Sequence, residues 1–156
     1  MIAGFVIELS LRCLLVVLFL PFSAMDKILN FRDAVAQARQ AIPPAAVATG
    51  LILVGLAVEV FMSLGVVTGI ADRFAAFVLG GYCMVTALLW KRFWMLGDFR
   101  LAGESKARDL FWDFLKNFSL AGGFMLLAFG TNAATASLFL THPFASSHPY
   151  ASVGNW

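Results

Sequence analysis

The sequence consists mostly of four long apolar stretches, at positions 2–22, 45–67, 74–90 and 115–136. A helix needs about 20 apolar residues to cross roughly 30 Å of hydrocarbon. The stretches lack the alternation of a strand, and inside lipid only helices or closed barrels satisfy every backbone polar group. The sequence therefore predicts an all-α protein, a transmembrane four-helix bundle.

Composition supports a membrane protein. Hydrophobic residues make up 61% of the chain and charged residues 13%, whereas about a quarter of a soluble domain is charged. A net charge of +2 is too small to favour nucleic acid as a partner, so we expect a lipid bilayer and other membrane subunits instead. We expect residues 1–140 to form one four-span domain and residues 141–156 an extramembrane tail.

The loops carry an asymmetric set of basic residues, which predicts the topology. Nine lie in or beside the two long loops, 23–44 and 91–114, and only Arg73 lies in the short turn at the opposite side. Because basic loops stay in the cytoplasm, we expect both long loops inside and both termini outside a bacterial-type inner membrane. Phe22 fits poorly before a signal-peptide cleavage site, so the first stretch is expected to remain as a helix.

The loop before the last apolar stretch mixes aromatic and charged residues. Glu104 and Arg108 have the spacing of a helical ion pair, and apolar residues continue that periodicity into the last stretch. This pattern predicts an interfacial amphipathic helix in the third loop. It fits either an anchor at the membrane surface or a docking surface for a cytoplasmic partner.

The cysteines and histidines do not predict a metal site. Cys13 and Cys83 lie far apart within apolar stretches, without CxxC spacing. His142 and His148 lie in a Pro-containing tail that offers neither carboxylate nor thiol as a further ligand. We therefore expect no metal, and a tail that is extended against a partner or disordered.

Charged residues inside the apolar stretches are the candidate site. Glu8 and Arg12 lie one turn apart in the first stretch, and Glu59 lies in the second at a similar distance from the stretch end. Because a charge near the bilayer centre costs about 2.5 to 3.5 kcal/mol, such residues usually pair inside protein. We predict that Arg12 and Glu59 meet. Their network either fixes helix packing or lines a polar pocket with further candidates Lys27, Tyr82, Cys83 and Thr86.

These residues resemble the DoxX family of small four-span membrane proteins. The resemblance rests on Arg12, on the segment running to Lys27, and on Glu59 in the second stretch. It continues through the small and basic residues of the following turn, Gly65, Thr68, Gly69, Arg73 and Ala75.

The resemblance implies a membrane subunit of an oxidoreductase or electron-transfer complex, with quinone as a candidate ligand of the polar network. The sequence shows no haem ligand pair, flavin fingerprint or cysteine cluster, so electron carriers are expected from partners or quinone rather than as intrinsic cofactors. The alternative is a non-enzymatic accessory or assembly subunit of a larger membrane complex. A small transporter is disfavoured because inverted repeats are not detectable.

Overall fold

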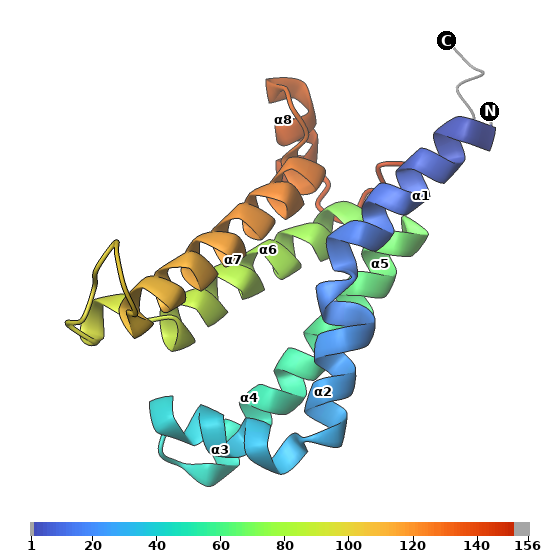
Figure 1. Cartoon of the computed structure of the whole chain (residues 1–156). Coiled ribbons are helices and arrows are strands. Elements are labelled where there is room, and N and C mark those ends of the chain that lie inside the picture. The colour runs from blue at the N-terminus through green and yellow to red at the C-terminus, as the bar shows by residue number, and fades with distance from the viewer. Residues whose placement is uncertain (1, 152–156) are drawn as a thin grey trace.

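The computed structural model describes residues 2–151, and these form helices joined by turns and loops, with no strand among them. The all-α prediction is confirmed. The elements in chain order are α1 (Ile2–Val16), the kinked turn η1 (Leu18–Ser23), α2 (Ala24–Leu29), α3 (Phe31–Ala41), α4 (Ala45–Ala57), the π-helical turn η2 (Val58–Met62), α5 (Ser63–Thr68), α6 (Asp72–Trp90), the 3-10 turn η3 (Phe93–Met95), α7 (Lys106–Phe129) and α8 (Ala133–Thr141). Figure 1 labels the α-helices.

Three helical segments are long and apolar enough to cross a membrane, Ile2–Leu29, Ala45–Thr68 and Asp72–Met95. A fourth results if α7 and α8, which meet at an 80° bend, are counted as one broken span. These segments support a multi-pass membrane protein with three to four spans.

The last apolar stretch differs from its expected bounds, 115–136. The amphipathic residues before it do not form a separate helix but are the first turns of α7, which begins at Lys106. The helix ends at Phe129 because Gly130 takes a left-handed φ of 73°. Asn132 then caps α8 by accepting a hydrogen bond from the backbone N–H of Thr135.

The first long loop, 23–44, is largely helical rather than open. It contains α2, which continues the first span, and the amphipathic helix α3. The apolar face of α3 has helical spacing and packs on α4 and on the end of α6. The contacting side chains are Phe31, Ala34, Val35 and Ala38 from α3, and Ala48, Ile52 and Trp90 from its neighbours.

The first span is kinked near its middle. Leu20 leaves the helical region, with φ −122° and ψ 111°, directly before Pro21. The ring of a proline disfavours the helical conformation at the preceding residue. The span therefore changes direction at η1, which places Ser23 and Lys27 against η2 of the second span.

The turn between α5 and α6 depends on two glycines. A Cβ at Gly65 would lie 2.9 Å from the Cβ of Ala75, so the two helices approach closely there. Gly69 takes a φ of 79° to end α5, and a Cβ on it would meet Pro149 at 2.8 Å. The small residues at these positions let the backbone reverse within a few residues.

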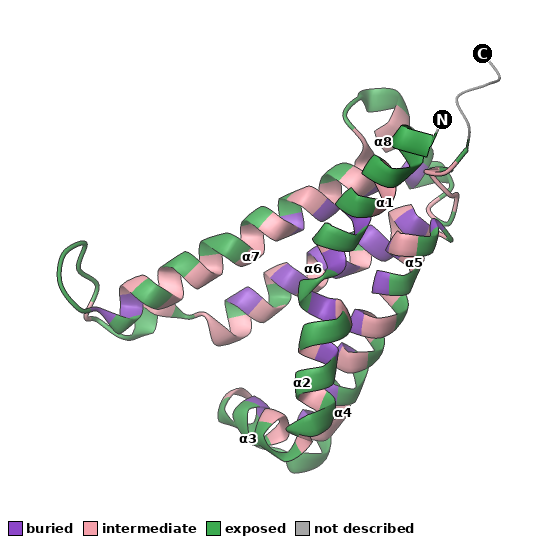
Figure 2. Ribbon diagram, turned by 45° about the vertical axis from the view of Figure 1, so that its right-hand side comes forward, coloured by how far each residue is buried: buried purple, intermediate pink, exposed green. Residues whose placement is uncertain are grey.

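The helices form two arms, which meet along part of α6. In Figure 1, α6 and α7 run side by side, while α1 and α2 accompany α4 and α5, and the two arms diverge toward α3. Figure 2 shows buried positions along α6 and largely exposed outer faces on α1 and α2. Exposed apolar faces are expected where lipid surrounds a protein.

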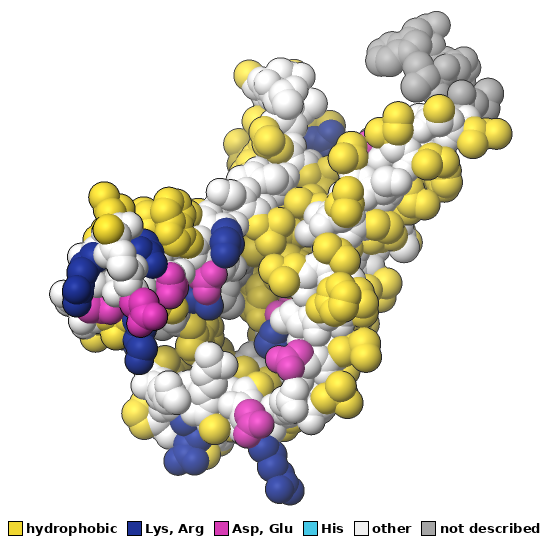
Figure 3. All heavy atoms as spheres, viewed as in Figure 1, with side chains coloured by type: hydrophobic (Ala, Val, Ile, Leu, Met, Phe, Trp, Pro, Cys, Tyr) yellow, Lys and Arg dark blue, Asp and Glu magenta, His cyan; other side chains and the backbone are white. Residues whose placement is uncertain are grey.

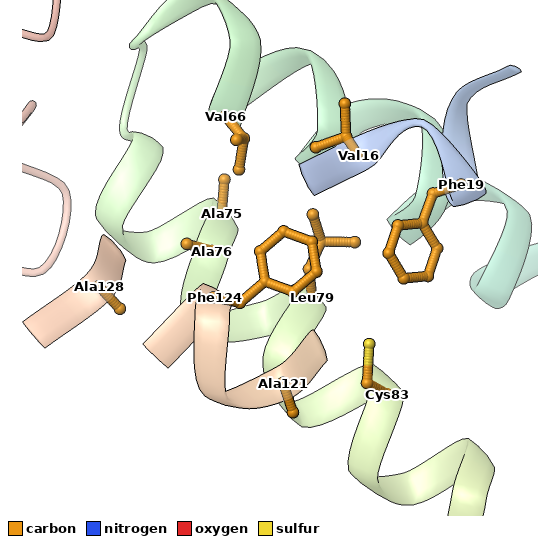
Figure 4. Close-up of a cluster of buried hydrophobic side chains, with 10 residues drawn as sticks. All are labelled: Val16, Phe19, Val66, Ala75, Ala76, Leu79, Cys83, Ala121, Phe124 and Ala128. Atoms are coloured by element: carbon orange, nitrogen blue, oxygen red, sulfur yellow. The ribbon is translucent and has the colours of Figure 1, made fainter. Parts of the chain in front are cut away.

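The core lies where the two arms meet. Phe124 of α7 and Leu79 of α6 are fully buried there, and Val16 and Phe19 approach from the first span (Figure 4). Cys83 belongs to this same apolar cluster. The core thus holds the arms together on one side and leaves the space near α3 unfilled.

Candidate functional site

Arg12 and Glu59 do not pair, and the prediction that they meet is wrong. Arg12 contacts Val66 near the end of α5, seven residues further along the chain than Glu59, and it contacts Asp72 at the start of α6. Seven helical residues correspond to about 10 Å. The prediction placed the ends of the first two spans at one level, whereas α1 extends beyond the turn after α5 (Figure 1).

Arg12 instead organises a cluster beside the α5–α6 turn, which we call the turn cluster: Glu8, Arg12, Asp72 and Ser147. The guanidinium donates to Glu8 Oε1 at 2.8 Å, to Asp72 Oδ2 at 2.8 Å and to Ser147 Oγ at 2.9 Å. It also donates to the carbonyl of Val66 at 2.7 Å. Arg12 is 3% exposed and Asp72 is fully buried, so this ion pair lies inside the protein.

The tail after α8 completes this cluster. Ser147 donates to Asp72 through its backbone N–H, at 2.9 Å, and through its hydroxyl. Ser146 donates to the carbonyl of Gly69 at 2.7 Å, and the Tyr150 hydroxyl donates to the carbonyl of Val67. Burial raises the pKa of the Tyr150 hydroxyl above its ordinary value. Residues 146–150 are therefore packed against the spans.

Glu59 organises a second, separate group, which we call the cavity cluster: Ser23, Lys27, Glu59 and Tyr82. Its Oε1 accepts hydrogen bonds from Lys27 Nζ at 2.6 Å, from Tyr82 Oη at 2.8 Å and from Ser23 Oγ at 3.0 Å. Lys27 also donates to Ser23 Oγ at 2.6 Å. The cluster draws one side chain each from η1, α2, η2 and α6.

The kinked turn η1 of the first span and the π-helical turn η2 of the second span position this cluster. Ser23 ends η1 and Glu59 lies within η2, and the two turns contact each other. A π-turn inserts an extra residue into a helix, which re-aims the side chains around it and often marks functional sites. Gly55, just before η2, leaves room for Tyr82, because a Cβ there would lie 3.1 Å from its hydroxyl.

The cavity cluster lines a cavity of about 700 Å³ between the arms. Lys27, Glu59, Tyr82 and Thr86 all line it, whereas Cys83 belongs to the apolar core and does not. Glu8 and Arg12 also lie outside it. Further polar lining comes from the α2–α3 side and the arm ends: Asp26, Asn30, Asp33, Gln37, Lys91 and Asn117. Figure 3 shows the hollow between α3 and the α6–α7 arm, with charged side chains at its rim.

The second carboxylate oxygen of Glu59, Oε2, has no hydrogen-bond donor among the described residues. Oε2 is buried and accepts no hydrogen bond from residues 2–151, although Glu59 is only 1% exposed. An unsatisfied buried acceptor costs about 1–3 kcal/mol, and more when charged. Because Glu59 lines the cavity, a small rotation of its carboxylate would let Oε2 accept a hydrogen bond or a proton from a molecule inside the cavity.

Several residues of these clusters were missed by the sequence reasoning. Asp72 lies in a short turn outside the apolar stretches, so hydropathy gave no signal of its burial beside Arg12. Ser147 lies 135 positions from Arg12, and nothing local indicates that contact. Within the described part of the chain, no group of three or more His, Cys, Asp or Glu side chains is placed to hold a metal ion.

Comparison with known proteins gives one match. A family model described as DoxX matches residues 7–92, which include Arg12, Lys27, Glu59, Asp72 and Tyr82. Comparison with curated proteins found no match, and neither did comparison with solved structures.

Proposed function

The chain belongs to the DoxX family, and from that premise we propose that it is an integral membrane subunit of an oxidoreductase or electron-transfer complex that binds a quinone headgroup beside Glu59. The observation that carries the proposal is the buried Oε2 of Glu59, an acceptor without a donor in the wall of a cavity. A quinol hydroxyl is a donor of the required kind.

The cavity suits an amphiphile that enters from lipid. Several of its apolar lining residues are themselves exposed on the outer surface of the helices: Leu18, Leu51, Val54 and Val85. In a membrane such side chains face hydrocarbon, so the cavity has an apolar side as well as a polar end. A small polar head with an apolar tail fits that division.

The residues of the cavity cluster supply what a quinone headgroup needs. A quinone, when bound, accepts two electrons and two protons, and partner subunits would provide the electrons. Lys27 has three donor hydrogens, and Ser23 and Glu59 accept two of them, so the third can be donated to a carbonyl oxygen. Glu59 Oε2 can hold the hydrogen of a hydroxyl. The polar residues on the α2–α3 side connect this position to the end of the molecule where water is expected.

The proposal is tested by Glu59→Gln, which keeps the shape and the Oε1 acceptor but replaces Oε2 with a donor. Full-length protein would be purified in mild detergent, and quinone would be extracted and quantified per mole of protein. We expect at least about a tenfold loss of bound quinone, equivalent to about 1.4 kcal/mol. Glu8→Gln, in the turn cluster, is the matched control and should retain quinone.

The outcomes separate a chemical site from a structural one. A Glu59→Gln variant that is present at normal levels and still retains quinone contradicts the proposal. A variant that disappears from the membrane shows that the cluster holds the spans together. If the parent protein carries no quinone in repeated preparations, the accessory function is favoured.

The accessory or assembly role is the second candidate, and the exposed outer face of the first span favours it. Leu11 and Leu14 are exposed there, so α1 can pack against another membrane subunit as readily as against lipid. Co-purification of a stable partner with a quinone-free chain would support this function.

The proposed setting is a bacterial-type inner membrane, crossed four times, with both termini outside and both long loops in the cytoplasm. This orientation rests on the nine basic residues in or beside the two long loops, against one, Arg73, at the opposite side. The α7–α8 unit is the fourth span in this arrangement. Reporter fusions after residue 100 and after α8 should report opposite sides, and a shared side would contradict the topology.

A further inference from the structure

The end of the molecule formed by residues 91–112 exposes large apolar side chains next to basic ones. Leu101 is 81% exposed and Met95 is 66% exposed. The other exposed apolar side chains of this surface are Trp94, Leu96, Phe99 and Trp112. Figure 3 shows hydrophobic and basic side chains side by side at the free end of the α6–α7 arm. We call this surface the arm end.

The arm end is a folded platform and not a loose linker. Phe93 lies at its centre, with ring centroids 5.0 Å from Phe111, 5.6 Å from Phe114 and 5.1 Å from Trp94. Asp98 accepts hydrogen bonds from the first backbone N–H groups of α7, at 2.9 and 3.1 Å. These contacts order the backbone from which the exposed side chains project.

Within residues 91–116, three of the four carboxylates are engaged, those of Asp98, Asp109 and Asp113, whereas half of the cations form no ion pair with residues 2–151. Asp98 caps α7, and Asp113 pairs with Lys91 at 3.1 Å and with Lys116 at 3.4 Å. Residues 91–116 contain six basic and four acidic residues. The basic residues that form no ion pair with any residue of 2–151 are Arg92, Arg100 and Lys106.

We propose that the arm end binds the headgroups of anionic phospholipids. These lipids lie in the leaflet that surrounds the end of α6 and the start of α7. The three cations supply charge complementary to phosphate, and Trp94 and Leu101 supply apolar anchors at the depth where amphipathic aromatics lie. The surface directly continues two membrane spans, so a lipid headgroup layer is the neighbour within reach. The family match ends at residue 92, before most of this surface.

Lipid selectivity can be measured on the whole protein by the fluorescence of Trp94. The other three tryptophans would be replaced by Phe, and the protein reconstituted in vesicles containing brominated phosphatidylglycerol or brominated phosphatidylcholine as quencher. We expect phosphatidylglycerol to reach half-maximal quenching at a much lower mole fraction. Because each basic residue near a surface contributes about 1 kcal/mol, the advantage of three is about 100-fold.

The variant Arg92→Gln/Arg100→Gln/Lys106→Gln should lose this advantage and leave quenching by phosphatidylcholine unchanged. The charge-retaining control Arg92→Lys/Arg100→Lys should keep it, and added salt should reduce it in the parent. Equal quenching by both lipids in the parent overturns the selectivity. Absence of quenching by either lipid places the arm end outside the bilayer, overturns the proposal and favours a protein partner. Bound quinone is unaffected by this variant, so the two proposals fail independently.

Discussion

The turn cluster and the cavity cluster are both ion pairs buried between spans, yet they differ in how completely their polar atoms are used. In the turn cluster, Arg12 donates to two carboxylates, a carbonyl and a hydroxyl. In the cavity cluster, three donors converge on one oxygen of Glu59 and none of the described residues donates to the other. A saturated cluster without a cavity stabilises the fold, whereas a half-saturated one beside a cavity can bind.

This contrast also shows that a buried charge alone does not identify a binding site. The sequence marks Arg12 and Glu59 equally, because both interrupt apolar stretches. Only the number of contacts around each charge, and the space beside it, separates the two. The predictions below test that separation through stability, from the largest expected effect to the smallest.

Arg12→Ala should destabilise the protein most. It leaves Asp72, which is fully buried, without its cation, and breaking a buried pair in this way costs about 3–5 kcal/mol. Thermal unfolding in detergent, followed by circular dichroism, measures the loss. Glu8→Gln is the control, since Glu8 is partly exposed and should cost below about 1 kcal/mol. Equal effects of the two variants would show that the turn cluster does not depend on Asp72.

Ser147→Ala should weaken the same cluster by less. It removes a hydroxyl that contacts both Arg12 and Asp72, while the backbone N–H of residue 147 still donates to Asp72. Hydrogen bonds to charged groups contribute about 1.5–3 kcal/mol. The same unfolding assay applies, with Ser119→Ala, at an exposed position of α7, as the control. A neutral result would mean that the tail is not held by this side chain.

Tyr82→Phe should cost about 1.5 kcal/mol, the lower end of the range for a hydrogen bond to a charged group. Glu59 Oε1 keeps its contacts with Lys27 and Ser23 when the hydroxyl is removed. If the cavity binds quinone, bound quinone should fall more clearly than stability does. A large loss of stability with unchanged quinone would reverse the functions assigned to the two clusters.

Ser63→Ala should be neutral or stabilise by up to about 1 kcal/mol. The Ser63 hydroxyl is fully buried one turn after Glu59 and has no partner within residues 2–151, so its removal relieves an unmet hydrogen bond. Chemical denaturation resolves a difference of this size. A clear destabilisation would instead reveal that Ser63 is satisfied by a bound molecule, which would extend the polar wall beyond Glu59.

The spans and several lining residues were predictable because hydropathy and charge are local signals. The first three apolar stretches lie within the observed spans, and the DoxX resemblance agrees with the family match. Three of the candidate residues, Lys27, Tyr82 and Thr86, line the cavity beside Glu59. Cys83, also a candidate for the pocket lining, lies in the apolar core instead. It follows Tyr82 directly, and neighbouring helical residues point in directions about 100° apart.

The pairing of the charges was not predictable, because it depends on how far one span slides along another. The kink at Leu20 and the extension of α1 beyond the next turn set that register, and neither is visible in hydropathy. The helix α3 was missed for a related reason. Its apolar face is short and interrupted by charges, and only packing on α4 and Trp90 makes it stable.

The tail contact has a consequence for how the protein is made. Arg12 leaves the ribosome early, and the serine that completes its coordination follows 135 positions later. Synthesis proceeds from the amino end. Until the tail docks, the guanidinium of Arg12 and the carboxylate of Asp72 therefore lie in the membrane without their hydrogen bonds to Ser147. Chains interrupted before that serine would retain an exposed polar slot between the first and third spans, a defect that membrane proteases could recognise.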